Sequence, residues 1–152
     1  MTKLLVVCLG VILSLPAPEA FSLADPVGDR GARDYFFRFS TSAGRYTIRQ
    51  DGLGELAANM KRRVFALKLA GKGRIERIYF LEHQGDLLLR YDVIGQGSYL
   101  MRIDQKTRKP RWFTALGEID ATDHVPAIDG EVLVVAEDIQ IGKTDGKIIR
   151  QD

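Results

Sequence analysis

A strand–turn–strand pattern recurs along the chain and constrains the fold more than any other feature. It is clearest in Ser98–Trp112, where apolar and polar side chains alternate, a polar run follows at Gln105–Lys109, and an aromatic extended segment resumes. Alternation with a period of two is typical of a half-buried β-strand, and a polar run between two such strands is typical of a hairpin turn. The sequence therefore predicts an all-β fold of antiparallel hairpins.

Related hairpins are predicted on both sides of this one. Glycine-containing polar turns at Gly71–Gly73, His83–Gly85 and Asp145–Gly146 separate strand-like segments from Arg63 onward. A supersecondary unit that recurs along a chain indicates a repeat architecture, here a hairpin meander. The run Leu87–Leu89 is wholly apolar, as in an inner strand covered on both faces.

One segment predicts a helix instead. Leu53, Leu56, Ala57 and Met60 share one face at helical spacing, and Asp51 precedes them as a candidate N-cap. We expect one short helix within residues 53–62, with a loop containing a single helical turn as the alternative.

The N-terminal segment predicts export. Leu4–Leu15 is almost wholly apolar after an early lysine, and Ser22 and Ala24 place small residues three and one positions before a cleavage site at Asp25. This is the layout of a cleavable secretory signal peptide. The apolar run is shorter than the about 20 residues that span a bilayer. An uncleaved anchor or a buried helix is the alternative.

These boundaries predict a signal peptide over residues 1–24, a flexible lead-in over 25–34 and a single β-repeat domain over 35–152. The only cysteine, Cys8, would leave with the signal peptide, and export without disulfides fits a periplasm. We expect a secreted or periplasmic protein with no integral membrane span after cleavage.

Charge indicates which partners to expect. The 22 basic and 20 acidic side chains are interspersed and leave a formal net charge of +2. So mild a balance gives little support for binding to nucleic acid or to a membrane surface. An open sheet presents unpaired edge strands, so we expect a protein partner or self-association through sheet edges.

Residues that could carry chemistry are few. His83 is predicted to be a solvated turn residue, with a catalytic base as the alternative. His124 follows three acidic side chains, Glu118, Asp120 and Asp123, in one predicted loop. Carboxylates and an imidazole could bind a cation, but their spacing matches no known ligand motif. We therefore expect an interaction loop, with no catalytic residue, no metal and no cofactor.

The hairpin motif also carries a family resemblance. Asp104, Thr107, Lys109 and Trp112 are followed by the strand-opening segment Pro126–Val135 and by a second turn that contains Gly146. Over about residues 85–150 this arrangement resembles the repeat of the quinoprotein-type (pyrroloquinoline-quinone-like) β-propellers. The resemblance implies that these turn residues and the tryptophan dock neighbouring blades together. Arg150 occupies the place of a second docking tryptophan.

A propeller needs at least four blades, so a chain of this length predicts an incomplete propeller or a small barrel. Together with the predicted signal peptide, the resemblance implies an exported, non-enzymatic binding or scaffold protein that acts by protein–protein interaction in the cell envelope. Two alternatives stay open: a small-ligand carrier with a barrel interior, and a remnant or subunit of a quinone-dependent dehydrogenase.

Overall fold

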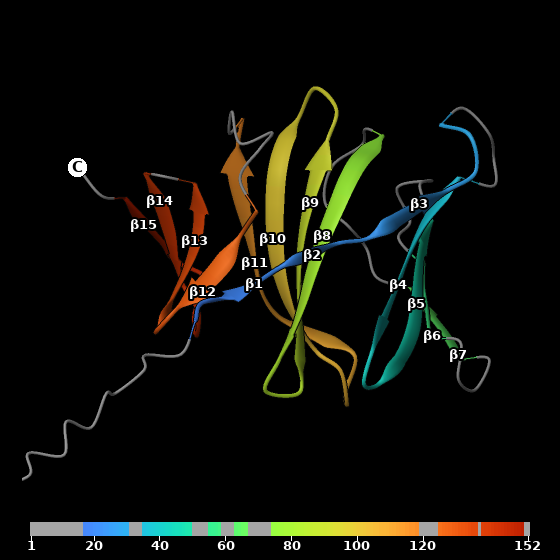
Figure 1. Cartoon of the computed structure of the whole chain (residues 1–152), viewed down its shortest axis with the longest axis horizontal. Helices are drawn as coiled ribbons and strands as arrows, with labels where there is room; N and C mark the ends of the chain where they lie inside the picture. The colour runs from blue at the N-terminus through green and yellow to red at the C-terminus, as the bar shows by residue number, and fades with distance from the viewer. Residues whose placement is uncertain are drawn as a thin grey trace, which may run out of the picture.

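The structure is a computed structural model that describes residues 17–30, 35–49, 55–58, 63–66, 74–118, 125–136 and 138–150. All the regular secondary structure in these residues is β, arranged as three antiparallel sheets of five strands each (Figure 1). The predicted all-β fold of antiparallel hairpins is therefore confirmed. None of the three sheets closes into a barrel, so the small-barrel alternative is wrong, and a ligand carrier has no barrel interior here.

Each sheet is a four-stranded meander to which the N-terminal segment adds a fifth strand. The N-terminal sheet consists of β3 (Asp25–Val27), β4 (Phe36–Thr41), β5 (Gly44–Arg49), β6 (Glu55–Ala58) and β7 (Arg63–Ala66). The middle sheet consists of β2 (Ser22–Leu23), β8 (Ile75–His83), β9 (Asp86–Val93), β10 (Gly97–Asp104) and β11 (Lys109–Gly117). The C-terminal sheet consists of β1 (Glu19–Ala20), β12 (Ala127–Asp129), β13 (Val132–Ala136), β14 (Ile139–Gly142) and β15 (Ile148–Arg150).

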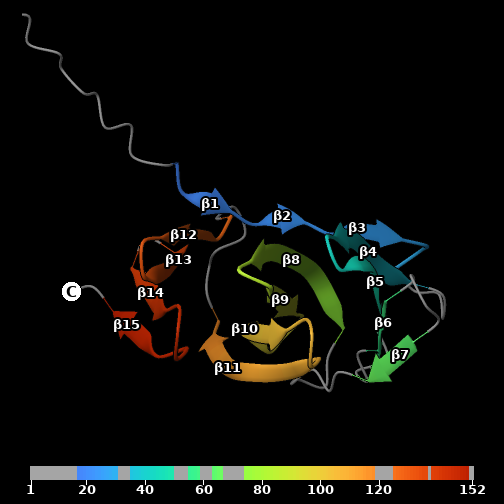
Figure 2. The same cartoon turned by 90° about the horizontal axis from the view of Figure 1, so that it is seen from below.

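The middle sheet lies between the other two and is packed on both faces (Figure 2). Leu87 and Leu89 of β9 belong to a core shared with Phe37 of the N-terminal sheet. Leu88, between them, belongs to a second core shared with Leu133 of the C-terminal sheet. Because successive side chains of a strand point to opposite faces, the apolar run Leu87–Leu89 supplies both cores, as predicted for an inner strand.

The helix predicted within residues 53–62 is wrong where the structure describes it. Glu55–Ala58 forms β6, in which Leu56 pairs with Ile48 of β5 and with Phe65 of β7. Strands on both sides supply backbone hydrogen bonds, which outweigh a helical pattern that is marginal in so short a segment. Leu53, Met60 and the candidate cap Asp51 lie outside the described residues.

The N-terminal segment also differs from expectation. The first three residues of the predicted flexible lead-in form β3, which pairs with β4, whereas residues 31–34 lie outside the described part of the chain. Upstream, Glu19–Ala20 and Ser22–Leu23 form β1 and β2 within the predicted signal peptide. Residues 1–16 are not described, so cleavage of a signal peptide stays a prediction.

Candidate interaction site

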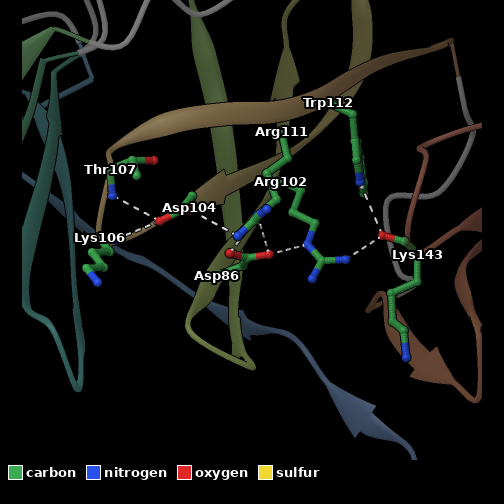
Figure 3. Close-up of polar contacts among 8 residues, drawn as sticks. All are labelled: Asp86, Arg102, Asp104, Lys106, Thr107, Arg111, Trp112 and Lys143. Carbon is green, nitrogen blue, oxygen red and sulfur yellow. Dashed lines mark hydrogen bonds and ion pairs between the residues drawn. The ribbon is translucent and has the colours of Figure 1, made fainter.

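The hairpin of β10 and β11 is closed by an aspartate-capped turn. The Oδ1 atom of Asp104 accepts hydrogen bonds from the backbone N–H groups of Lys106 and Thr107, each at 2.9 Å (Figure 3). The Thr107 N–H in particular holds the pKa of Asp104 below its ordinary value. Arg108 adopts a left-handed conformation with φ of 61°, and its N–H donates to the Asp104 carbonyl at 2.7 Å. An aspartate that bonds its own turn in this way fixes the direction in which β11 leaves.

Trp112 joins the middle sheet to the C-terminal sheet. Its Nε1–H donates to the carbonyl oxygen of Lys143 at 3.2 Å (Figure 3). The Thr114 hydroxyl donates to the Gly146 carbonyl. A Cβ atom at Gly146 would lie 2.7 Å from two carbons of the Trp112 ring. The indole therefore packs directly against the backbone of the glycine turn.

Among the residues predicted to dock repeats, the structure brings only Trp112 and Gly146 together across two sheets. Thr107 lies exposed in the turn, and Lys109 is exposed at the start of β11, where it pairs in register with Asp104. The docking role of the set stays a prediction from the resemblance.

A buried aspartate at the same junction was missed in the sequence. The Asp86 carboxylate is only 3% exposed and accepts hydrogen bonds from Nε of Arg102 and from Nε of Arg111, the latter at 3.0 Å (Figure 3). Arg111 also donates to Asp104 at 2.9 Å, and Arg102 donates to the Lys143 carbonyl at 2.8 Å. We name Asp86, Arg102 and Arg111 the arginine clamp.

The arginine clamp depends on how β9, β10 and β11 align, and the sequence alone does not give this register. Asp86 and Asp104 are partners across β9 and β10, and Arg102 is the partner of Trp112 across β10 and β11. Two neighbouring carboxylates repel each other unless a cation lies between them, and here Arg111 contacts both. Their sequence separation hides this arrangement.

Of the predicted interaction loop the structure describes only Glu118, which follows β11 at the end of the middle sheet opposite the turn that Asp104 caps. Glu118 is exposed and lines a hollow of about 260 Å³ together with Arg90, Asp92 and Ser98. Asp92 accepts a hydrogen bond from the Ser98 hydroxyl at 2.6 Å and pairs with Arg90 at 3.3 Å. The other three loop residues, Asp120, Asp123 and His124, lie outside the described residues.

His83 differs from its prediction as a solvated turn residue. Because Gln84 and Gly85, both with positive φ, form the two-residue turn, His83 becomes the last residue of β8 and pairs with Asp86. Its side chain is buried, and its Nδ1 atom lies 2.9 Å from Oε2 of Glu19 in β1. Through this contact with Glu19, His83 fixes β1 against the end of β8.

A cluster of polar side chains joins the N-terminal sheet to the middle sheet. The Glu82 carboxylate accepts hydrogen bonds from the Ser42 N–H at 2.8 Å, from the Ser42 hydroxyl and from the Gln105 amide at 2.9 Å. Gln105 in turn accepts from the Tyr46 hydroxyl at 2.7 Å. Partial burial raises the pKa of Glu82, but the hydrogen bonds from Ser42 and Gln105 outweigh it and leave that pKa below its ordinary value.

Glu82→Gln should therefore change how stability responds to acid. A carboxylate whose pKa is lowered by folding stabilises the fold above its ordinary pKa of 4.5, and this contribution is lost as the pH falls through the lower folded value. We expect the gap in urea midpoint between the wild type and Glu82→Gln to narrow from about pH 7 to about pH 3. A gap that stays constant would contradict the assignment.

The outer edges of two sheets differ in how they meet solvent. Along β11, exposed Lys109, Pro110 and Arg111 begin the edge strand, and such residues discourage pairing with another chain. Along β15 the exposed residues include Ile148 and Ile149, so this edge strand is short but apolar.

Comparison of the chain with protein-family models, with curated proteins and with solved structures finds no match. The propeller resemblance therefore depends on the sequence motifs alone and stays a prediction. Within the described ranges, no three His, Cys, Asp or Glu side chains come together as a metal ion would require. The same ranges contain no helix long and apolar enough to cross a membrane.

Proposed function

We propose that this chain is an exported scaffold protein that binds other proteins in the cell envelope through the open edge of its C-terminal sheet. The observation that carries the proposal is β15. Within the described part of the chain it pairs only with β14, and it exposes 45% of Ile149 on a strand whose three residues are all exposed.

An edge of this kind matches a known mode of protein recognition. The free side of an edge strand offers backbone N–H and C=O groups to an added strand, and neighbouring side chains select which strand is added. Ile149 pairs with Gln140 of β14, which pairs with Val134 of β13, and the row continues through Ala127 of β12 to Ala20 of β1. A partner strand along β15 would extend the row by one residue.

Site-specific photo-cross-linking in the producing cells tests the proposal. A photoreactive phenylalanine analogue replaces Ile149 in one variant. In the matched control it replaces Phe113, which is 41% exposed on β11, the edge strand that begins with charged residues and proline. We expect discrete cross-linked products from position 149 that are absent at position 113, in the envelope fraction. Equal products from both positions, or none from position 149, would contradict the proposed edge.

A charge at the same position provides the second measurement. Ile149→Lys should leave the free energy of unfolding within about 0.5 kcal/mol of wild type, because the side chain is exposed. It should nevertheless reduce co-purification of the partner that the cross-link identifies at least about tenfold, because a lysine on an edge strand opposes pairing. Phe113→Lys serves as the control and should retain the partner.

A further inference from the structure

The N-terminal segment fills the inner edges of the middle and C-terminal sheets. β1, β2 and β3 follow one another along one side of all three sheets (Figure 2). Glu19 and Ala20 pair with β12, and Ser22 and Leu23 pair with β8. Between and after these pairs, the Phe21 N–H donates to the Pro126 carbonyl at 2.8 Å, and the Ala24 N–H donates to the Ile78 carbonyl at 2.8 Å.

The same segment inserts side chains into both cores. Phe21 is 4% exposed and belongs to the core between the middle and C-terminal sheets. Ala24 is 1% exposed and belongs to the core between the middle and N-terminal sheets. Glu19 meets the buried His83 at 2.9 Å, whereas Leu23 points to solvent. We name the place occupied by Glu19–Ala24 the inner slot.

The predicted cleavage after Ala24 would remove this whole segment. What stays behind is an unpaired edge on β12, an unpaired edge on β8, and the apolar space that Phe21 fills in the complete chain. Backbone groups at an open edge and an empty apolar socket both favour an extended peptide that replaces the lost strand.

We propose that signal-peptide removal opens the inner slot and that the exported protein binds there an extended segment of a partner protein. The segment carries an acidic residue, an aromatic residue two positions later and a small residue three positions after that, as Glu19, Phe21 and Ala24 do. The inference rests on the export included in the proposed function, and it names a second contact surface, separate from β15.

The first measurement is the intact mass of the protein recovered after export. We expect a chain that begins at Asp25. A mature chain that retains Phe21 overturns the inference, because the slot is then filled by its own strand.

The second measurement is a titration of that exported protein with a labelled synthetic peptide whose sequence is that of residues 19–24, followed by fluorescence anisotropy. We expect saturable binding, weakened at least about tenfold when the peptide carries Phe21→Asp. The full chain produced without export, with its own segment in place, is the matched control and should bind the peptide at least about tenfold more weakly. Absent binding, or equal binding by either control, overturns the inference.

A mutant cycle locates the acidic end of the peptide. His83→Ala in the exported protein should weaken binding of the peptide that carries glutamate, because His83 faces that residue. Binding of the peptide that carries Glu19→Gln should be unchanged. An equal loss for both peptides contradicts the placement. Failure here is separable from failure of the proposed function: cross-linking at Ile149 does not depend on the inner slot.

Discussion

Replacing Asp86 with alanine is expected to destabilise the fold by about 3–5 kcal/mol, the range for a buried ion pair that loses one partner. The carboxylate is 3% exposed, and its removal leaves the largely buried Arg102 guanidinium without its anionic partner. Arg111, half exposed, regains water instead. Urea denaturation followed by the fluorescence of Trp112, the only tryptophan, measures the loss at the junction that the arginine clamp supports.

The control is an ion pair whose carboxylate lies at the surface. Glu131 is 84% exposed and lies 3.4 Å from the ammonium of Lys143, which is itself buried. That ammonium keeps its hydrogen bond to the Gly130 carbonyl at 2.9 Å when Glu131 is removed, so Glu131→Ala should cost at most about 1 kcal/mol. The double variant Asp86→Leu with Arg102→Leu should recover much of the lost stability, because burying two apolar side chains avoids the desolvation of both charges. Equal losses for Asp86→Ala and Glu131→Ala would show that the clamp contributes no more than a pair whose carboxylate is exposed.

Gly146→Ala is expected to cost about 2–5 kcal/mol and to shift the Trp112 emission to longer wavelength. The backbone at this glycine has φ of 70°, which costs an L-residue about 1–2 kcal/mol. The new methyl group would also lie 2.7 Å from the indole ring, and overpacking of this kind costs about 1–3 kcal/mol. Displacement of the indole toward solvent explains the expected spectral shift.

Gly130→Ala separates the two causes. Gly130 has a similar φ of 58°, but a Cβ atom there would meet nothing within 4 Å. It should therefore lose only the conformational part, about 1–2 kcal/mol, with unchanged emission. If the two variants lose equal stability and neither shifts the emission, then the indole does not pack against the glycine turn.

Strands and turns between Ile75 and Arg150 could be predicted because their signals are local. Alternating side chains and turn glycines act over a few residues, and the wholly apolar run Leu87–Leu89 already indicates an inner strand. β6 could not be predicted, because Leu56 becomes part of a strand through Ile48 and Phe65, and nothing in its own segment indicates those partners.

The polar part of the site was harder to predict than the fold. Asp104 and Trp112 belong to a motif within one hairpin, so the sequence shows them together. The arginine clamp arises only when register brings Asp86 beside Arg102 and Arg111, and a charged residue in a strand gives no sign of which partner it will meet. His83 was misplaced for a smaller reason, a turn one residue shorter than expected.

The alternation of side chains along β9 has a consequence for how the molecule comes apart. Leu88 packs with the C-terminal sheet, while its immediate neighbours Leu87 and Leu89 pack with the N-terminal sheet. The two hydrophobic cores are thus opposite sides of one backbone, so displacement of β9 removes packing from both. We therefore expect the three sheets to unfold together in one transition.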